Sequence, residues 1–130
     1  MKKWLLYTVA SGCLLSTACH HNPRQGKDPA SEVVFNQPVT LEVANHNWSD
    51  VTVYVVYGSQ RTRLTTVTAT QEAAVTLPAH ALRPSGEIRL LAHAVGNPNT
   101  FLSEVIVAKS GMTIAWTLET DLHRSSLAVW

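Results

Sequence analysis

Among the side chains in this sequence, histidine can take part in the most kinds of chemistry, because its imidazole can bind a metal ion or exchange a proton near neutral pH. The chain has six histidines. His20 and His21 are adjacent, and the others fall in separate segments without the His-x-His or His-x₃-His spacing that pre-organises a metal site. These others are His46, His80, His93 and His123. We therefore expect no metal site and no cofactor.

Catalysis by a nucleophile requires a serine, threonine or cysteine beside a base that is oriented by an acid. The sequence contains no Gly-x-Ser-x-Gly turn, and its acidic residues are spread singly along the chain. Glycosidases, in contrast, work with a pair of carboxylates. We expect no enzymatic activity, and a hydrolase assembled from distant residues ranks third among the functions considered.

Arg61 and Arg63 are two residues apart, which places both on one face of a strand. Such a pair could receive an acidic partner or a sugar phosphate. More often it keeps one face of a sheet soluble or protects an edge strand from pairing with other chains. We favour this second interpretation.

Trp48 is the aromatic residue whose position is least expected, because it follows the turn residues Asn45, His46 and Asn47. One interpretation, which we favour, is that its ring caps one end of a hydrophobic core. The alternative is that the ring stacks on a sugar or docks a protein, with the flanking asparagines contributing polar contacts. Asn97 and Asn99, in the turn of residues 96–99, belong to a second candidate binding loop.

The N-terminus has the three parts of an export signal. Lys2 and Lys3 are followed by an apolar stretch that is too short to cross a bilayer as a helix, which needs about 20 residues. Small residues then lead to Cys19. Cys13 is a second candidate, but the apolar run before it is shorter still. No other cysteine exists, so the rest of the chain cannot form a disulfide of its own.

This N-terminus resembles the bacterial lipoprotein signal, in which a leucine and two small residues precede the modified cysteine. Ala18 and Cys19 match the pattern, whereas Ser16 stands where leucine is usual. The resemblance implies cleavage after residue 18 and a lipid on Cys19. Because His20 replaces the aspartate that would retain such a protein in the inner membrane, it also implies an outer-membrane anchor, facing the periplasm or the cell surface.

Residues 19–34 contain prolines, a glycine and polar groups without apolar periodicity, which is typical of a flexible tether. From residue 35 to 130, short runs rich in β-branched residues alternate with turn residues. The runs expected to be strands are 39–43, 50–57, 61–68, 72–77, 87–95, 101–108, 112–118 and 125–130. Residues 50–57 are apolar nearly throughout, as in a central strand covered on both faces. One helical turn is expected within residues 79–82.

Seven or eight strands at this spacing predict a single all-β domain, an antiparallel β-sandwich. The pattern resembles Ig-like and transthyretin-like sandwiches, although the cysteines of true Ig domains are absent. Removing residues 1–18 takes away Lys2 and Lys3 and leaves eight basic against nine acidic residues, a formal charge of −1. A near-neutral domain has no electrostatic reason to bind nucleic acid.

These observations predict a non-enzymatic lipoprotein of the cell envelope. Its membrane contact is the lipid on Cys19, and its sandwich is expected to bind an envelope protein or to serve as an accessory subunit. A module that binds carbohydrate or a small ligand through Trp48 is the alternative.

Overall fold

The structure is a computed structural model that describes residues 34–130. The predicted signal peptide, Cys13, Cys19, His20, His21 and the tether as far as residue 33 lie outside the described residues. The described residues form nine strands and two short 3₁₀ helices. In chain order they are β1 (Thr40–Asn45), β2 (Val51–Tyr57), β3 (Gln60–Val67), β4 (Glu72–Thr76), η1 (Ala79–Ala81), β5 (Glu87–Ala94), β6 (Thr100–Leu102), β7 (Ile106–Val107), β8 (Thr113–Leu118), η2 (Leu122–Arg124) and β9 (Ser126–Val129).

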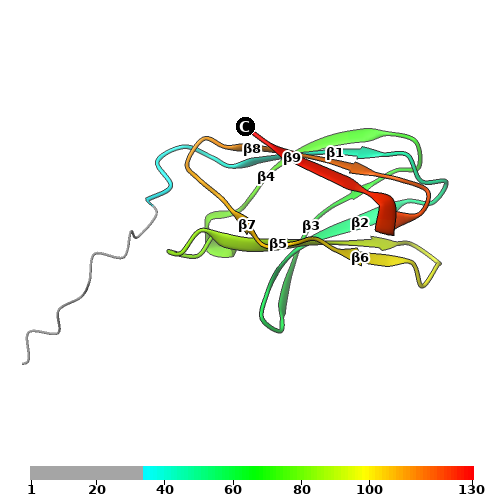
Figure 1. Ribbon diagram of the computed structural model, residues 1–130, viewed down its shortest axis with the longest axis horizontal. Coiled ribbons are helices and arrows are strands. Elements are labelled where there is room, and N and C mark those ends of the chain that lie inside the picture. The colour runs from blue at the N-terminus through cyan, green and yellow to red at the C-terminus, as the bar shows by residue number, and fades with distance from the viewer. Residues whose placement is uncertain (1–33) are drawn as a thin grey trace, which may run out of the picture.

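The strands form two sheets that lie one over the other (Figure 1). Sheet A has the order β4-β1-β8-β9. Sheet B has the order β3-β2-β5-β6, and β7 pairs with β5 farther along the same edge. The predicted all-β sandwich is confirmed. Every strand pair is antiparallel except β1 and β8, which run parallel from Thr40 beside Thr113 to Asn45 beside Leu118.

The described part has one strand more than predicted, because the run 101–108 is interrupted at Ser103. The Ser103 hydroxyl accepts a hydrogen bond from Leu90 N–H at 2.9 Å and donates to the Glu104 carbonyl oxygen at 2.8 Å. A side-chain oxygen thus takes the place of a backbone carbonyl in the ladder, and the strand divides into β6 and β7. The buried Ser103 side chain is the physical reason for the break.

The core lies between the sheets and is built from alternate residues of the strands. In β5 and β8 every second residue is buried, as the sequence alternation predicted. Trp116 is the largest fully buried side chain, with 1% of its surface exposed. Its indole Nε1 has no hydrogen-bond partner within the described residues. Phe101 packs beside it with 6.3 Å between ring centroids.

The prediction that residues 50–57 are covered on both faces is wrong. Val51, Val53 and Val55 are buried in the core, but Tyr54 and Val56 on the opposite face are only half-buried. A two-layer sandwich covers one face of each sheet, and no third layer lies over sheet B in residues 34–130. Arg63 and Arg61 pair with Tyr54 and Val56 across the ladder. Long arginine side chains can shield such apolar groups while their charges stay in water.

The chain enters the sandwich at the end where β1 begins. Gln37 N–H donates to Ser110 Oγ at 2.7 Å, and Gly111 N–H donates to the Gln37 carbonyl oxygen at 3.4 Å. Trp48 follows the other end of β1. The entry point and the Trp48 loop therefore lie at opposite ends of the domain (Figure 1). No helix among residues 34–130 has the length and apolar character needed to cross a membrane.

Candidate functional site

Four loops meet at the end of the sandwich opposite the chain entry. They are residues 46–50, 68–71, 95–99 and 119–125. Asp50 and Asn47 of the first loop bond through their side chains to the backbone of the second and fourth loops, at Ala69 and Thr120. Asn99 Nδ2 of the third loop lies 3.5 Å from the Thr120 carbonyl oxygen. Both binding loops predicted from the sequence are therefore at one end, and we call this set of loops the loop end.

Asn45 holds the base of the loop end. It is fully buried, and its Nδ2 lies 3.0–3.1 Å from the carbonyl oxygens of Ser49, Val67 and Thr68. Its Oδ1 accepts a hydrogen bond from Asn47 N–H at 3.0 Å. An amide offers both donors and an acceptor, so this one buried side chain can bond to backbone groups of four residues at the base of the loops.

Asn47 repeats this arrangement on the other side of the loop. Its Nδ2 donates to the carbonyl oxygens of Glu119 at 3.2 Å and Thr120 at 2.8 Å, and its Oδ1 accepts from Ser49 N–H at 3.0 Å. The side chain is 5% exposed. Of the residues predicted to recognise a ligand, Asn45 and Asn47 are thus committed to the protein's own backbone.

Trp48 directly follows Asn47, and 80% of its surface is exposed. The favoured interpretation, that it caps the core, is wrong. The two asparagines turn their side chains inward. Asn45 holds the Asn47 N–H and Asn47 holds the Ser49 N–H, so the backbone is bonded before and after residue 48, whose side chain points outward. A large apolar ring is thus exposed to water on a loop whose backbone is hydrogen-bonded to buried side chains.

Three further residues of the candidate loops lie near the surface. His46 Nδ1 is 3.5 Å from Glu119 Oε1, and both side chains are about half exposed. Asn97 is exposed, and its Oδ1 accepts from Asn99 N–H at 2.9 Å, which closes a tight turn. These groups are available to a partner only at the rim of the loop end.

A second concave surface lies along one open side of the sandwich, where β9 of sheet A faces β6 and β7 of sheet B. We call it the edge groove. Its apolar lining is Phe101, Val105, Ile106, Val107, Leu127 and Val129, and its volume is about 490 Å³. Val105, Val107 and Val129 are among the exposed large hydrophobic residues of the described chain. Nothing in the sequence indicated the groove, because its two walls are formed by separate segments.

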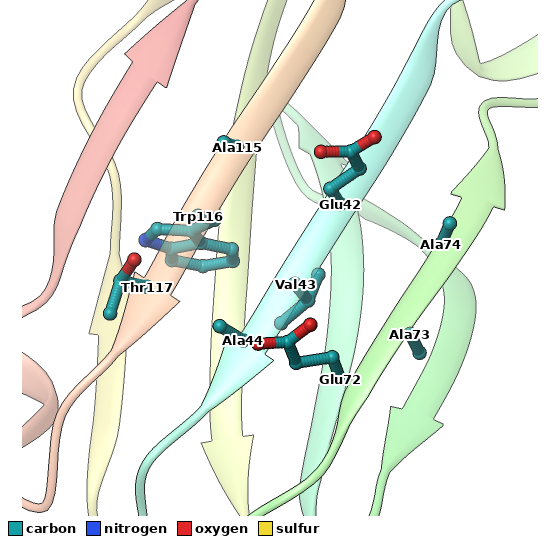
Figure 2. A pocket seen from close by; sticks show the side chains of 9 residues that line it. All are labelled: Glu42, Val43, Ala44, Glu72, Ala73, Ala74, Ala115, Trp116 and Thr117. Atoms are coloured by element: carbon teal, nitrogen blue, oxygen red, sulfur yellow. The ribbon is translucent and has the colours of Figure 1, made fainter.

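A third depression, of about 460 Å³, lies on sheet A over β4, β1 and β8 (Figure 2). The small side chains of Ala44, Ala74 and Ala115 on the outer face of the sheet leave it shallow. Figure 2 shows the carboxylates of Glu42 and Glu72 above different parts of it. The depression results from small side chains on the outer face of a sheet and contains no other charged group.

Side chains that could together hold a metal ion do not cluster in the part of the chain that the structure describes. Among residues 34–130, no group of three or more His, Cys, Asp or Glu side chains is close enough to hold a metal ion. His123 packs edge-on against Phe101, with 5.9 Å between centroids. Arg61 and Arg63 are exposed on the edge strand β3, as expected, and Arg63 Nη2 donates to Thr66 Oγ1 at 2.7 Å.

No model of a known protein family matches the chain, and no curated protein matches it. Among solved structures, the chain is similar to the NMR structure of a protein from Eubacterium rectale. The two share 11% sequence identity and a TM-score of 0.41, over 73% of this chain and 88% of the other. This level of similarity assigns neither a family nor a function.

Proposed function

We propose that this protein is an exported lipoprotein, anchored through Cys19, whose β-sandwich binds another protein of the cell envelope through the loop end. The observation that carries the proposal is the 80% exposure of Trp48 on a loop fixed by buried asparagines. Tryptophan is enriched at the few interface positions that supply most of the binding energy. A fixed backbone lowers the entropy lost on binding.

A protein partner fits the loop end better than a carbohydrate. Sugar recognition needs polar side chains beside the aromatic ring, because each hydroxyl that loses water must find a new hydrogen bond. The amides of Asn45 and Asn47 are already used inside the domain. A protein surface can bury the indole in an apolar pocket without needing those amides.

The position of the chain entry supports the same proposal. The tether would join the sandwich at the end where Gln37 contacts Ser110, away from Trp48. A domain held by an N-terminal lipid would then present Trp48 away from the membrane surface. An accessory subunit that reaches a partner in the envelope needs this orientation.

The proposal is tested by photo-cross-linking in native envelopes. The full chain carries p-benzoylphenylalanine at position 48 or, as a matched control, at position 57. Tyr57 is also an exposed aromatic residue, but it lies at the end of β2 away from the loop end. The Arg83 guanidinium lies 4.0 Å from the centre of its ring. We expect one discrete protein adduct from position 48 and none from position 57. The same adduct from both positions, or none from either, would contradict the proposal.

The anchor is tested separately by mass spectrometry of the exported chain. The wild type and a Cys13→Ala variant should both carry a diacylglycerol thioether, whereas Cys19→Ala should not. A lipid that persists in Cys19→Ala and is lost in Cys13→Ala would move the anchor to Cys13.

The carbohydrate-binding alternative rests on the same exposed indole, since a sugar ring can stack on its face. A glycan array probed with wild-type protein and Trp48→Ala separates the two functions. Specific glycan binding that disappears in the variant would replace the protein-binding proposal.

A further inference from the structure

The exposed edge of β9 has main-chain groups without partners. Thr113 and Trp130 exchange hydrogen bonds of 2.9 and 3.1 Å between their backbones. In an antiparallel ladder such pairs alternate, so Ala115–Ala128 and Thr117–Ser126 are the next bonded pairs along β8 and β9. The N–H and C=O groups of Leu127 and Val129 therefore point away from β8. Neither residue makes a main-chain bond outside the ladder within residues 34–130.

The side chains of these same two residues face the edge groove. Leu127 is half-buried against the core, and Val129 is 48% exposed. Both line the groove opposite Val107. A strand added beside β9 would bond to Leu127 and Val129 through its backbone and would cover the groove with every second side chain.

The other sheet edges carry features that discourage such pairing. Edge strand β4 has Glu72, and β3 has two arginines and a bulge opposite Val53 and Tyr54. The β6–β7 edge is divided at Ser103. Strand β9 has the sequence Ser-Leu-Ala-Val, without a charge, a proline or a bulge. It is the least protected edge in the described chain.

We propose that β9 forms a two-fold interface with β9 of a second copy of this chain. With the two-fold axis at Ala128, antiparallel pairing places Leu127 of each copy opposite Val129 of the other. These are the two residues whose backbone groups are unpaired, so every bond of the new ladder has a donor and an acceptor. Sheet A then continues across both copies.

A second copy fits this edge because β9 itself has the chemistry that the groove needs. The occupant must be extended and must present apolar side chains at alternate positions. Leu127 and Val129 do so, and a two-fold axis perpendicular to the sheet turns them toward the same face in both copies. The self-complementary pattern is what an isologous interface requires.

Two measurements on the full chain test the proposal. The first is sedimentation equilibrium of wild type and Val129→Pro. Proline removes the N–H that faces the second copy but no bond to β8, so we expect a wild-type dimer and a monomeric variant that is still folded, as circular dichroism would show. A wild-type monomer, or a dimer that survives in the variant, would overturn the proposal.

The second measurement does not require the fold to accept a proline in β9. Directly opposite residues in a non-hydrogen-bonded antiparallel pair have Cα atoms about 4.5 Å apart, which a disulfide can bridge. Oxidation of Ala128→Cys should yield a covalent dimer on a non-reducing gel. The matched control is Ala115→Cys on β8, beside Ala128 on the same face, and wild type gives the background from Cys13 and Cys19. Equal cross-linking of both variants, or none above background, would contradict pairing at Ala128.

Discussion

Asn47 Nδ2 donates a 2.8 Å hydrogen bond to the carbonyl oxygen of Thr120, joining the loop after β1 to the loop after β8. The bond is buried on the asparagine side and continues the contact between β1 and β8 beyond the end of their parallel ladder, which stops at Asn45 beside Leu118. The bond ties two loops of the loop end together. Trp48 directly follows Asn47, the residue that makes the bond. The stability of the domain depends on such hydrogen bonds between side chains and the backbone of distant segments.

Replacing Asn47 with alanine should lower the free energy of unfolding by about 1–3 kcal/mol, because it removes three hydrogen bonds from a buried amide to partly buried backbone groups of Ser49, Glu119 and Thr120. Urea unfolding followed by circular dichroism measures the change. Asn97→Ala is the control, since Asn97 is exposed, and should change stability by less than about 0.5 kcal/mol. Similar losses in both variants would show that the Asn47 amide has no special role.

Replacing Trp48 with alanine should leave the free energy of unfolding within about 0.5 kcal/mol of wild type, because the ring is in water. Trp116→Ala should instead cost about 3–5 kcal/mol, since it empties the centre of the core. Urea unfolding of both variants and the wild type measures these changes through the midpoint concentrations. A large loss in Trp48→Ala would restore the interpretation that this ring caps the core.

Replacing Ser103 with alanine should cost about 1–3 kcal/mol, because the buried Leu90 N–H loses its acceptor. Hydrogen exchange followed by NMR should show faster exchange of the Leu90 amide than in wild type. Ser85→Ala, at an exposed turn, is the control. An unchanged Leu90 amide would mean that a backbone carbonyl can take over and that the serine does not cause the break between β6 and β7.

Replacing Gly111 with alanine should cost about 1 kcal/mol, because its φ of +75° lies in the left-handed region that residues with a Cβ avoid. Asparagine tolerates this region better, so Gly111→Asn should be closer to wild type. The midpoint temperatures of thermal unfolding of the two variants and the wild type measure these losses of stability. If both cost the same, the crowding of the site by the Gln37 side chain, and not the backbone angle, sets the penalty.

Hydrophobic alternation was sufficient to predict most strands. Residues 87–95 were expected to form a strand, and β5 spans Glu87–Ala94. The single turn expected within residues 79–82 is η1. Alternation reports which side of a strand meets the core, but every pairing of core-facing strands satisfies it equally well. For this reason the parallel pairing of β1 with β8 could not be predicted.

The candidate site was predicted only in part, because its geometry depends on contacts between distant segments. The sequence indicated both loops of the loop end and singled out Trp48. It could not show that Asn45 and Asn47 turn inward, since their partners belong to loops near residues 68 and 120. The direction of the Trp48 ring follows from those bonds, and so the expectation for it was wrong.

The parallel pairing of β1 with β8 has a consequence for how the chain folds. Strand β1 is an inner strand of sheet A, and half of its ladder is supplied by residues 113–118. A chain that has not yet delivered those residues cannot complete the sheet, and pairings between such distant segments form slowly. Folding of this domain therefore waits until nearly all of residues 40–118 are available, because the inner strand of sheet A is complete only when both its neighbours have been made.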